Sequence, residues 1–206
     1  MLTGPGYSSG MIIPLSEPEA PAASTSCWAT LTPEAKCERV LAAAGEVFAA
    51  HGLEAPMSEV AAATGSGMSS VYRCFPSKHE LLAALVIRRM EQIAAAARDA
   101  EATAGDRWSA LRTMLHSIVE RQAADDFMGE ARARVADHPE VQAATRKAEA
   151  ALERLLVAAR DEGRLRPDAT TLDLRLLFAG TRAAKRVEPE QWPRMLELML
   201  DALEAR

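Results

Sequence analysis

RVLAAAGEVFAAHGLEAPMSEVAAATGSGMSSVYRCFPSKHEL, residues 39–81, contains three short helical patterns in succession. Breaks at His51-Gly52 and at Thr-Gly-Ser-Gly (residues 64–67) separate them, and the third pattern ends at Phe75-Pro76. Two helices joined by a tight turn that contains glycine are the minimal unit that places a helix in the major groove of DNA. The stretch therefore predicts a helix-turn-helix, and with it a DNA-binding function.

The ends of these helices carry local signals. Residues 32–34 (Thr-Pro-Glu) predict the start of the first helix, because they combine a hydroxyl N-cap, a proline at the first helical position and an acid near the positive helix end. The second helix is expected at about Met57–Thr64 and the third at about Met68–Cys74. Ser77 followed by Glu80 predicts a capping box at the start of a long fourth helix.

The rest of the chain also follows a helical period. Apolar residues recur at helical spacing to about residue 102, and then in five further segments, 108–122, 125–136, 138–163, 170–184 and 189–206. We find no strand pattern and no internal repeat, which predicts an all-α fold of about nine helices. The expected domains are a three-helix DNA-binding domain at 31–78 and a larger helical ligand-binding and dimerisation domain at 79–206. Residues 1–30, rich in Pro, Ser and Ala, are expected to form a flexible extension, and Met11 is an alternative start.

Composition agrees with packed helices. Hydrophobic residues make up 49% of the 206 residues and aromatic residues only 4%, which favours helices because strands draw on aromatic and β-branched residues. The formal net charge is −5, so bulk charge does not by itself indicate nucleic-acid binding. The local pattern is more informative, because residues 65–79 contain Arg73 and Lys78 but no acid. This surface can approach phosphates without repulsion.

Several other classes of protein are disfavoured. The sequence has no long apolar run and no secretory signal, so we expect no membrane contact and a cytoplasmic location. Cys27, Cys37 and Cys74 are odd in number and show no CxxC or His-paired spacing. We therefore expect no metal site, no cofactor and no disulfide framework. Each cysteine is predicted to be an inert thiol, with a redox switch as the alternative at Cys74.

The first three predicted helices and the start of the fourth share a motif with a known family. An apolar first helix ends in Phe and Gly, an apolar-Ala pair in the second helix leads to a turn, and a Tyr-x-x-Phe-x-x-Lys run follows. The matching positions are Phe48, Gly52, Val60, Ala61, Gly65, Tyr72, Phe75 and Lys78. In these positions the chain resembles the TetR family of bacterial transcriptional regulators. The resemblance implies a sequence-specific DNA-binding regulator, most often a repressor that a small-molecule effector releases from its operator.

The resemblance also implies roles for particular side chains. The third helix would enter the major groove, while other residues would hold phosphates or reach either backbone or base. The implied DNA-binding residues are Ser58, Gly67, Met68, Ser69, Ser70, Tyr72, Arg73 and Lys78. Two alternatives remain open: Tyr72 packs on Phe75, or Lys78 is a solvated surface charge.

The turn departs from the family pattern. Ser66, Gly67 and Ser69 replace the usual apolar, hydroxyl and glycine residues, and Cys37 stands where a basic residue is common. Residues 67–70 offer no Arg, Lys, Asn or Gln, the side chains that make bidentate contacts with bases. We therefore expect specificity to depend on Arg73, on DNA shape and on the spacing of a dimer.

The C-terminal part is expected to dimerise and to hold the effector. A homodimer would span two halves of a palindromic operator in double-stranded DNA. The predicted interface residues lie on the last two helices and are Leu172, Leu176, Ala179, Leu196, Met199, Leu200 and Leu203. The alternative is that the same residues close the core of one chain.

A cavity for the effector is predicted between the DNA-binding domain and the last two helices. Its predicted lining is Met114, Leu115, Ile118, Phe127, Met128, Leu155, Leu156 and Phe178, with His116 and Arg132 as polar anchors. In the alternative interpretation, these apolar residues form an ordinary hydrophobic core and line no cavity. An enzyme is disfavoured, because the four histidines are scattered and no nucleophile motif is present. An all-helical interaction module remains the other alternative.

Overall fold

The computed structural model describes residues 28–103, 105–124, 127–188 and 190–205. Within these ranges the chain forms nine α-helices and one short 3-10 helix, with no strand beyond an isolated bridge between Leu165 and Glu204. The elements are η1 (Trp28–Thr30), α1 (Pro33–His51), α2 (Met57–Thr64), α3 (Met68–Cys74), α4 (Lys78–Ala102), α5 (Arg107–Ala124), α6 (Met128–Arg134), α7 (Pro139–Asp161), α8 (Thr171–Val187) and α9 (Trp192–Leu203). The predicted all-α fold is confirmed.

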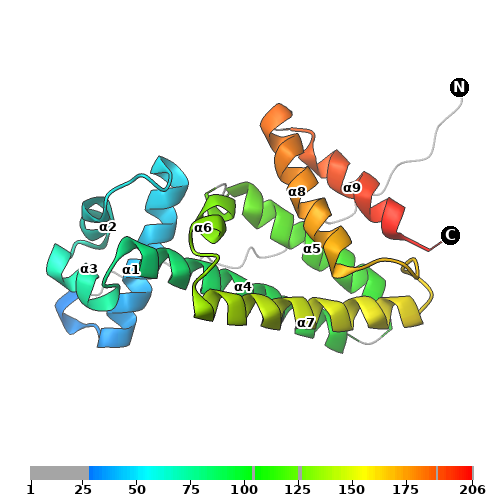
Figure 1. Cartoon of the computed structure of the whole chain (residues 1–206), viewed down its shortest axis with the longest axis horizontal. Helices are drawn as coiled ribbons and strands as arrows, with labels where there is room; N and C mark the ends of the chain where they lie inside the picture. The colour runs from blue at the N-terminus through cyan, green and yellow to red at the C-terminus, as the bar shows by residue number, and fades with distance from the viewer. Residues whose placement is uncertain (1–27, 104, 125–126, 189, 206) are drawn as a thin grey trace, which may run out of the picture.

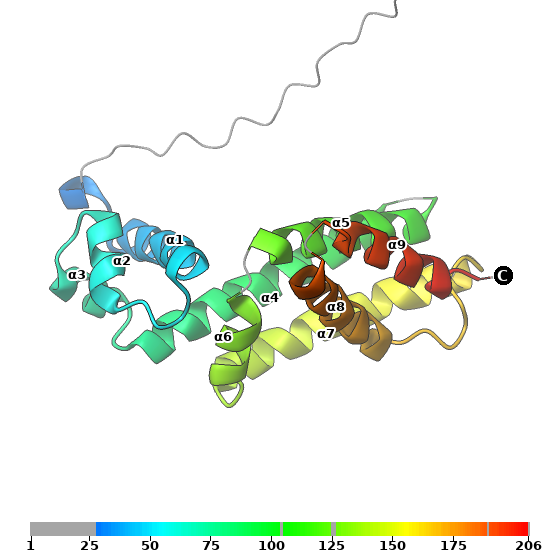
Figure 2. The same ribbon diagram turned by 90° about the horizontal axis from the view of Figure 1, so that it is seen from above.

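The helices form two groups along the long axis of the molecule. Helices α1, α2 and α3 gather at one end, and α4 leads from them into the second group (Figure 1). There α4 packs along α7, and Figure 2 shows the two helices side by side again from above. Helices α8 and α9 form a pair that stands out from the α4–α7 layer next to α5 (Figure 1). The arrangement separates a small N-terminal group, α1–α3, which we call the reading head, from a larger group, α4–α9, which we call the helical body.

Local signals explain where the first helices begin and end. The Thr32 hydroxyl accepts a hydrogen bond from the Ala35 amide at 3.2 Å, and Pro33 is the first residue of α1. Gly65 closes α2 in a left-handed conformation, at φ 65°, which a side chain disfavours. The Ser77 hydroxyl caps α4 by accepting from the Glu80 amide. The carboxylate of Glu80 lies 3.4 Å from the side chain of His138, the residue before α7.

Several predicted boundaries differ from the structure: α8 ends at Val187 and not at residue 184, and α9 covers Trp192–Leu203 and not 189–206. The segment expected at 125–136 is helical only over α6, and residues 125–126 lie outside the described residues. The predicted flexible extension includes Trp28–Thr30, which forms a 3-10 helix with Trp28 packed against the hydrophobic core. That contact needs a surface made by distant residues, so local composition does not reveal it. Residues 1–27 of the expected extension lie outside the described residues. Among the helices that the structure describes, none is long and apolar enough to cross a membrane.

Candidate nucleic-acid interface

One face of α3 is buried and the opposite face is free. Val71 is fully buried against α1 and α2, which fixes how the helix is turned about its axis. Met68 and Tyr72, one helical turn apart, are 37% and 44% exposed, and Ser69 and Arg73 beside them are also exposed. The structure therefore presents the four side chains together on one surface.

The turn before α3 is built from backbone and hydroxyl contacts. The Ser66 amide donates to the Ala61 carbonyl at 3.1 Å, and the hydroxyls of Thr64 and Ser66 lie 2.6 Å apart. Gly67 is exposed and supplies no side-chain cap to α3. At the start of α2, Ser58 is exposed, while the carboxylate of the neighbouring Glu59 is hydrogen-bonded to the His51 ring. A phosphate can approach Ser58 with that acid already partnered.

Lys78 has an internal role that its spacing did not predict. Its ammonium donates to the Ala55 carbonyl at 2.8 Å and lies 5.5 Å from the centre of the Phe48 ring. It therefore links the first residue of α4 to the loop between α1 and α2. An ammonium carries three donors, so two remain for a phosphate. The phosphate contact itself stays a prediction.

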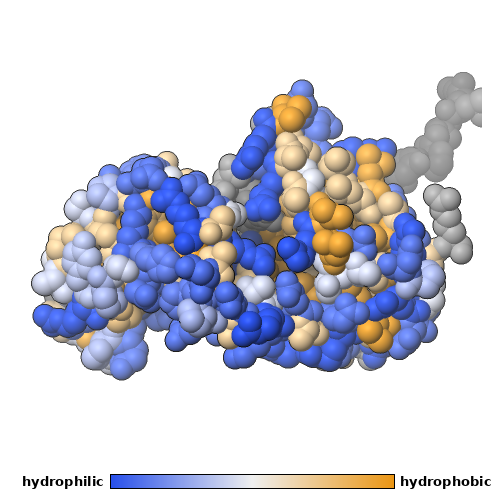
Figure 3. All heavy atoms as spheres, in the orientation of Figure 1, coloured by the Kyte–Doolittle hydropathy of each residue, from blue (hydrophilic) through white to orange (hydrophobic). Residues whose placement is uncertain are grey.

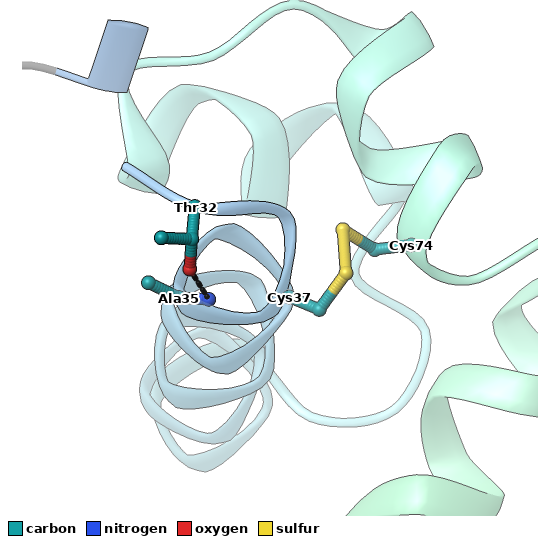
Figure 4. The surroundings of a disulfide bond; sticks show 4 residues. All are labelled: Thr32, Ala35, Cys37 and Cys74. Carbon is teal, nitrogen blue, oxygen red and sulfur yellow. Dashed lines mark hydrogen bonds between the residues drawn. A yellow bond between two sulfur atoms is a disulfide. The ribbon is translucent and has the colours of Figure 1, made fainter. Parts of the chain in front are cut away.

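The prediction of three inert thiols is wrong for two of them. Cys37 of α1 and Cys74, the last residue of α3, form a disulfide with their Cα atoms 5.2 Å apart (Figure 4). The pair spans 37 positions of sequence, so only the packing of α3 on α1 brings the sulfurs together. Cys27 lies outside the described residues. No group of three or more His, Cys, Asp or Glu side chains in the described part is placed to hold a metal ion.

Most of the predicted pocket residues pack in the core. Met114, Leu115, Ile118 and Leu155 are each at most 5% exposed, and Met128 and Phe178 lie against the same core. His116, a predicted polar anchor, forms an ion pair with Glu197 of α9 at 2.7 Å. Leu156, also predicted, is fully buried in that core. These positions support the plain-core alternative for much of the set.

A cavity of about 530 Å³ lies instead where the reading head meets the helical body. Phe48 and Leu53 contribute from the head, Phe127 and Gly129 from the α6 region, and Arg182 from α8. Phe127 is thus the predicted pocket residue that lines this cavity. The sequence predicted a cavity in this region but little of its lining, because the walls come from three distant segments.

Helix α6 couples the two groups of helices. The rings of Phe127 and Phe48 lie 6.0 Å apart, and the Arg134 guanidinium donates to both Glu54 of the head and Glu130 of its own helix at 2.6 Å. The hydrogen bond from Arg134 lowers the pKa of the exposed Glu54 carboxyl below its ordinary value. Helix α6 and its N-cap residue Phe127 therefore contact both the end of α1 and the loop that follows it.

Arginines gather between α6 and α8. Burial lowers the pKa of Arg132 on α6, and although nearby Glu149 opposes this effect, the positive charges of Arg175 and Arg182 add to it. The Arg182 guanidinium also lies where a side chain at Gly129 would stand. The region is therefore positively charged and close to the 530 Å³ cavity.

The predicted dimer residues divide into two groups. Leu172 and Leu176 are 56% and 59% exposed on α8, and Ala179 is exposed beside them. In contrast, Leu196 and Leu200 are fully buried within the chain. Leu203 is also buried, and Met199 packs over Gly180 of α8. The second group closes the core of one chain, which is the alternative that the sequence left open.

Other apolar residues on α8 and α9 are exposed, in contrast to the buried second group of predicted dimer residues. Val187, Met195 and Leu198 are exposed apolar side chains that the sequence pattern did not single out. Hydrophobic side chains also gather over α8 on the face drawn in Figure 3. Exposed apolar surface of this kind is characteristic of sites at which proteins associate.

These features define a class of protein: a helix-turn-helix regulator with a helical control domain. "Bacterial regulatory proteins, tetR family" is the family description that matches residues 40–85, and "Transcriptional regulator SbtR-like, C-terminal domain" matches residues 106–205. The chain belongs to the TetR family of transcriptional regulators, whose members are DNA-binding proteins with ligand-binding domains and are generally not enzymes.

Solved structures agree. A TetR regulator from Mycobacterium vanbaalenii is 30% identical, with a TM-score of 0.60 over 84% of this chain and 97% of that one. The regulator SCO0520 from Streptomyces coelicolor is 25% identical, with a TM-score of 0.64 over 82% and 98%. SmeT, the repressor of the Stenotrophomonas maltophilia multidrug efflux pump SmeDEF, is 28% identical, with a TM-score of 0.59 over 86% and 93%. A comparison with curated proteins finds no match.

Proposed function

We propose that this protein is a cytoplasmic homodimeric repressor that binds a palindromic operator and leaves it when an acidic effector binds. It acts by binding and not by catalysis. The observation that carries the proposal is the free face of α3, where Met68, Ser69, Tyr72 and Arg73 are exposed together in a stretch without acids. Such a face fits the major groove between two phosphate backbones.

Arg73 is the proposed source of base specificity. Among the exposed α3 residues it alone carries a guanidinium, which can bond a guanine at two positions. We expect Arg73→Ala to reduce the protein's preference for one base at the contacted position by about 1–3 kcal/mol. The preference is measured by selecting operators from a pool of random duplexes. Arg98→Ala, an exposed arginine on α4, is the matched control. An unchanged base preference in the Arg73 variant would contradict this assignment.

The exposed surface of α8 and α9 is the proposed dimer interface. Leu172, Leu176, Val187 and Leu198 leave apolar area in water that a second copy would cover in a four-helix bundle. A homodimer related by a twofold axis would place its two α3 helices in successive turns of the major groove. The operator is therefore expected to be palindromic.

The cavity between α1, α6 and α8 is the proposed effector site. Arg182 and Arg186 line it together with Phe48 and Phe127, so it suits a ligand that combines an acidic group with an apolar body. Glu130, the acid in its wall, is already bonded to Arg134. A ligand here touches the head, α6 and α8 at once, and so can favour one arrangement of the head over another.

A matched pair of ligands tests the charge requirement. Aromatic monocarboxylates, beginning with benzoate, are compared with their neutral amides for release of operator DNA in a fluorescence anisotropy titration. We expect release by the acids only, and its loss in Arg182→Gln. Equal release by acid and amide would overturn the proposed class of effector, whereas failure of the untreated protein to select any operator would overturn the DNA-binding proposal itself.

A further inference from the structure

We propose that Cys37 and Cys74 form a reversible oxidation site that sets the affinity of the reading head for DNA. The disulfide joins α1 to the last residue of α3, the helix that presents Tyr72 and Arg73 to DNA (Figure 4). A bacterial regulator of transcription works in a reducing compartment, where a disulfide forms only on oxidation. The inference rests on the proposed DNA-binding role of α3.

The site is accessible and chemically suited to oxidation. Both cysteines are only partly buried, and they line a pocket of about 180 Å³ together with Trp28, Lys36 and Arg73. The positive charges of Lys36 and Arg73 favour the thiolate, which is the form that attacks an oxidant. A small hydroperoxide or a dithiol reductant can therefore reach the sulfurs without unfolding of the head.

The proposed oxidant is a hydroperoxide, and the step balances. One thiolate attacks the peroxide oxygen to give a sulfenic acid and an alcohol, or water when the oxidant is hydrogen peroxide. The second thiol then attacks the sulfenic sulfur, forms the S–S bond and releases water. Overall, two thiols lose two electrons and two protons, which the peroxide takes up. A dithiol reverses the reaction by thiol–disulfide exchange.

The bond matters because α3 is weakly anchored in other respects. The helix has seven residues, no side-chain N-cap and a single buried residue, Val71. A helix this short does not persist without tertiary contacts. The disulfide ties down its C-terminal end, next to Arg73, in the position that α3 takes in the assembled head. In the reduced protein α3 keeps its contact through Val71 but loses the restraint at its C-terminal end, so DNA must order that end on binding and the affinity falls by the cost of that ordering.

The test compares oxidised and reduced full-length protein on a duplex selected from a random pool. Hydrogen peroxide or a dithiol sets the state, and mass spectrometry after alkylation verifies it. We expect the oxidised protein to bind about fivefold or more tightly than the reduced protein. Coupling between two equilibria is reciprocal. The bound duplex should therefore lower the equilibrium constant for reduction of the disulfide by the dithiol by the same factor.

Variants separate this site from other effects of oxidation. Cys27→Ser keeps the pair and should respond as the original protein does, while Cys37→Ser and Cys74→Ser should bind like the reduced protein in both conditions. Equal affinity of the oxidised and reduced forms, or tighter binding by the reduced form, would overturn the proposal. The comparison of the two states of the unaltered chain remains decisive even where a serine variant folds poorly. Failure of both states to bind any duplex would instead overturn the proposed function.

Discussion

Placing charges on the exposed face of α8 should separate the dimer into folded monomers. Full burial of a leucine side chain contributes about 1.5–3 kcal/mol. Leu172 and Leu176 are 56% and 59% exposed in the single chain, so covering each one contributes about 1.3 kcal/mol. A symmetric dimer contains both residues twice, which amounts to about 5 kcal/mol and roughly three and a half powers of ten in Kd. The double variant Leu172→Glu/Leu176→Glu should lose this contribution.

Sedimentation equilibrium measures the effect directly, because it gives the dimer Kd over a range of protein concentration. Val157→Glu is the matched control, since Val157 is 43% exposed and belongs to α7, which is not part of the proposed interface. The control should dimerise normally, and both variants should keep their helical circular dichroism. A dimer Kd that changes less than about tenfold in the double variant would refute the assignment of this face.

Three further predictions concern stability. Leu200→Ala empties a fully buried position of α9 and should cost about 2–5 kcal/mol in urea denaturation; an unchanged midpoint would contradict its burial. Reduction of the Cys37–Cys74 disulfide, which spans 37 positions, should lower the free energy of unfolding by about 4 kcal/mol and the Tm by about 10 °C. Calorimetry with and without reductant measures the Tm, and an equal Tm in both conditions would contradict a stabilising disulfide. The hydrogen bond from Arg107 lowers the pKa of Glu162 below its ordinary 4.5, so the carboxylate stabilises the fold above that pH and less as the pH falls. The advantage over Glu162→Gln should therefore shrink at acid pH in denaturation experiments, and a constant difference would argue against the pair.

Much of the helix pattern was predictable because its signals are local. The second and third helices begin and end at the residues expected from the sequence, Met57–Thr64 and Met68–Cys74. The caps at Thr32 and Ser77 depend on contacts within four residues, which composition and spacing can reveal. The exposed face of α3 was predictable for the same reason: Val71 is buried, so the residues on the opposite face of the helix are exposed.

The candidate site was less predictable, because it depends on contacts between distant segments. Lys78 meets the Ala55 carbonyl 23 positions away, and Arg134 meets Glu54 80 positions away. The helical period separates the face of α9 that carries Leu196 and Leu200 from Leu198, but only the packing of α9 on its neighbours shows that this face is buried within one chain and not between two chains.

The sequence by itself determined that this chain is helical and carries a helix-turn-helix, because helical period, caps and turn glycines act over a few residues. Only the tertiary structure decided that Cys37 pairs with Cys74, that a cavity opens between α1, α6 and α8, and that α8 supplies most of the exposed apolar face. Each of these features joins segments that lie far apart along the chain. Their geometry is set by how the helices pack, and a single sequence encodes that packing only through all of its contacts together.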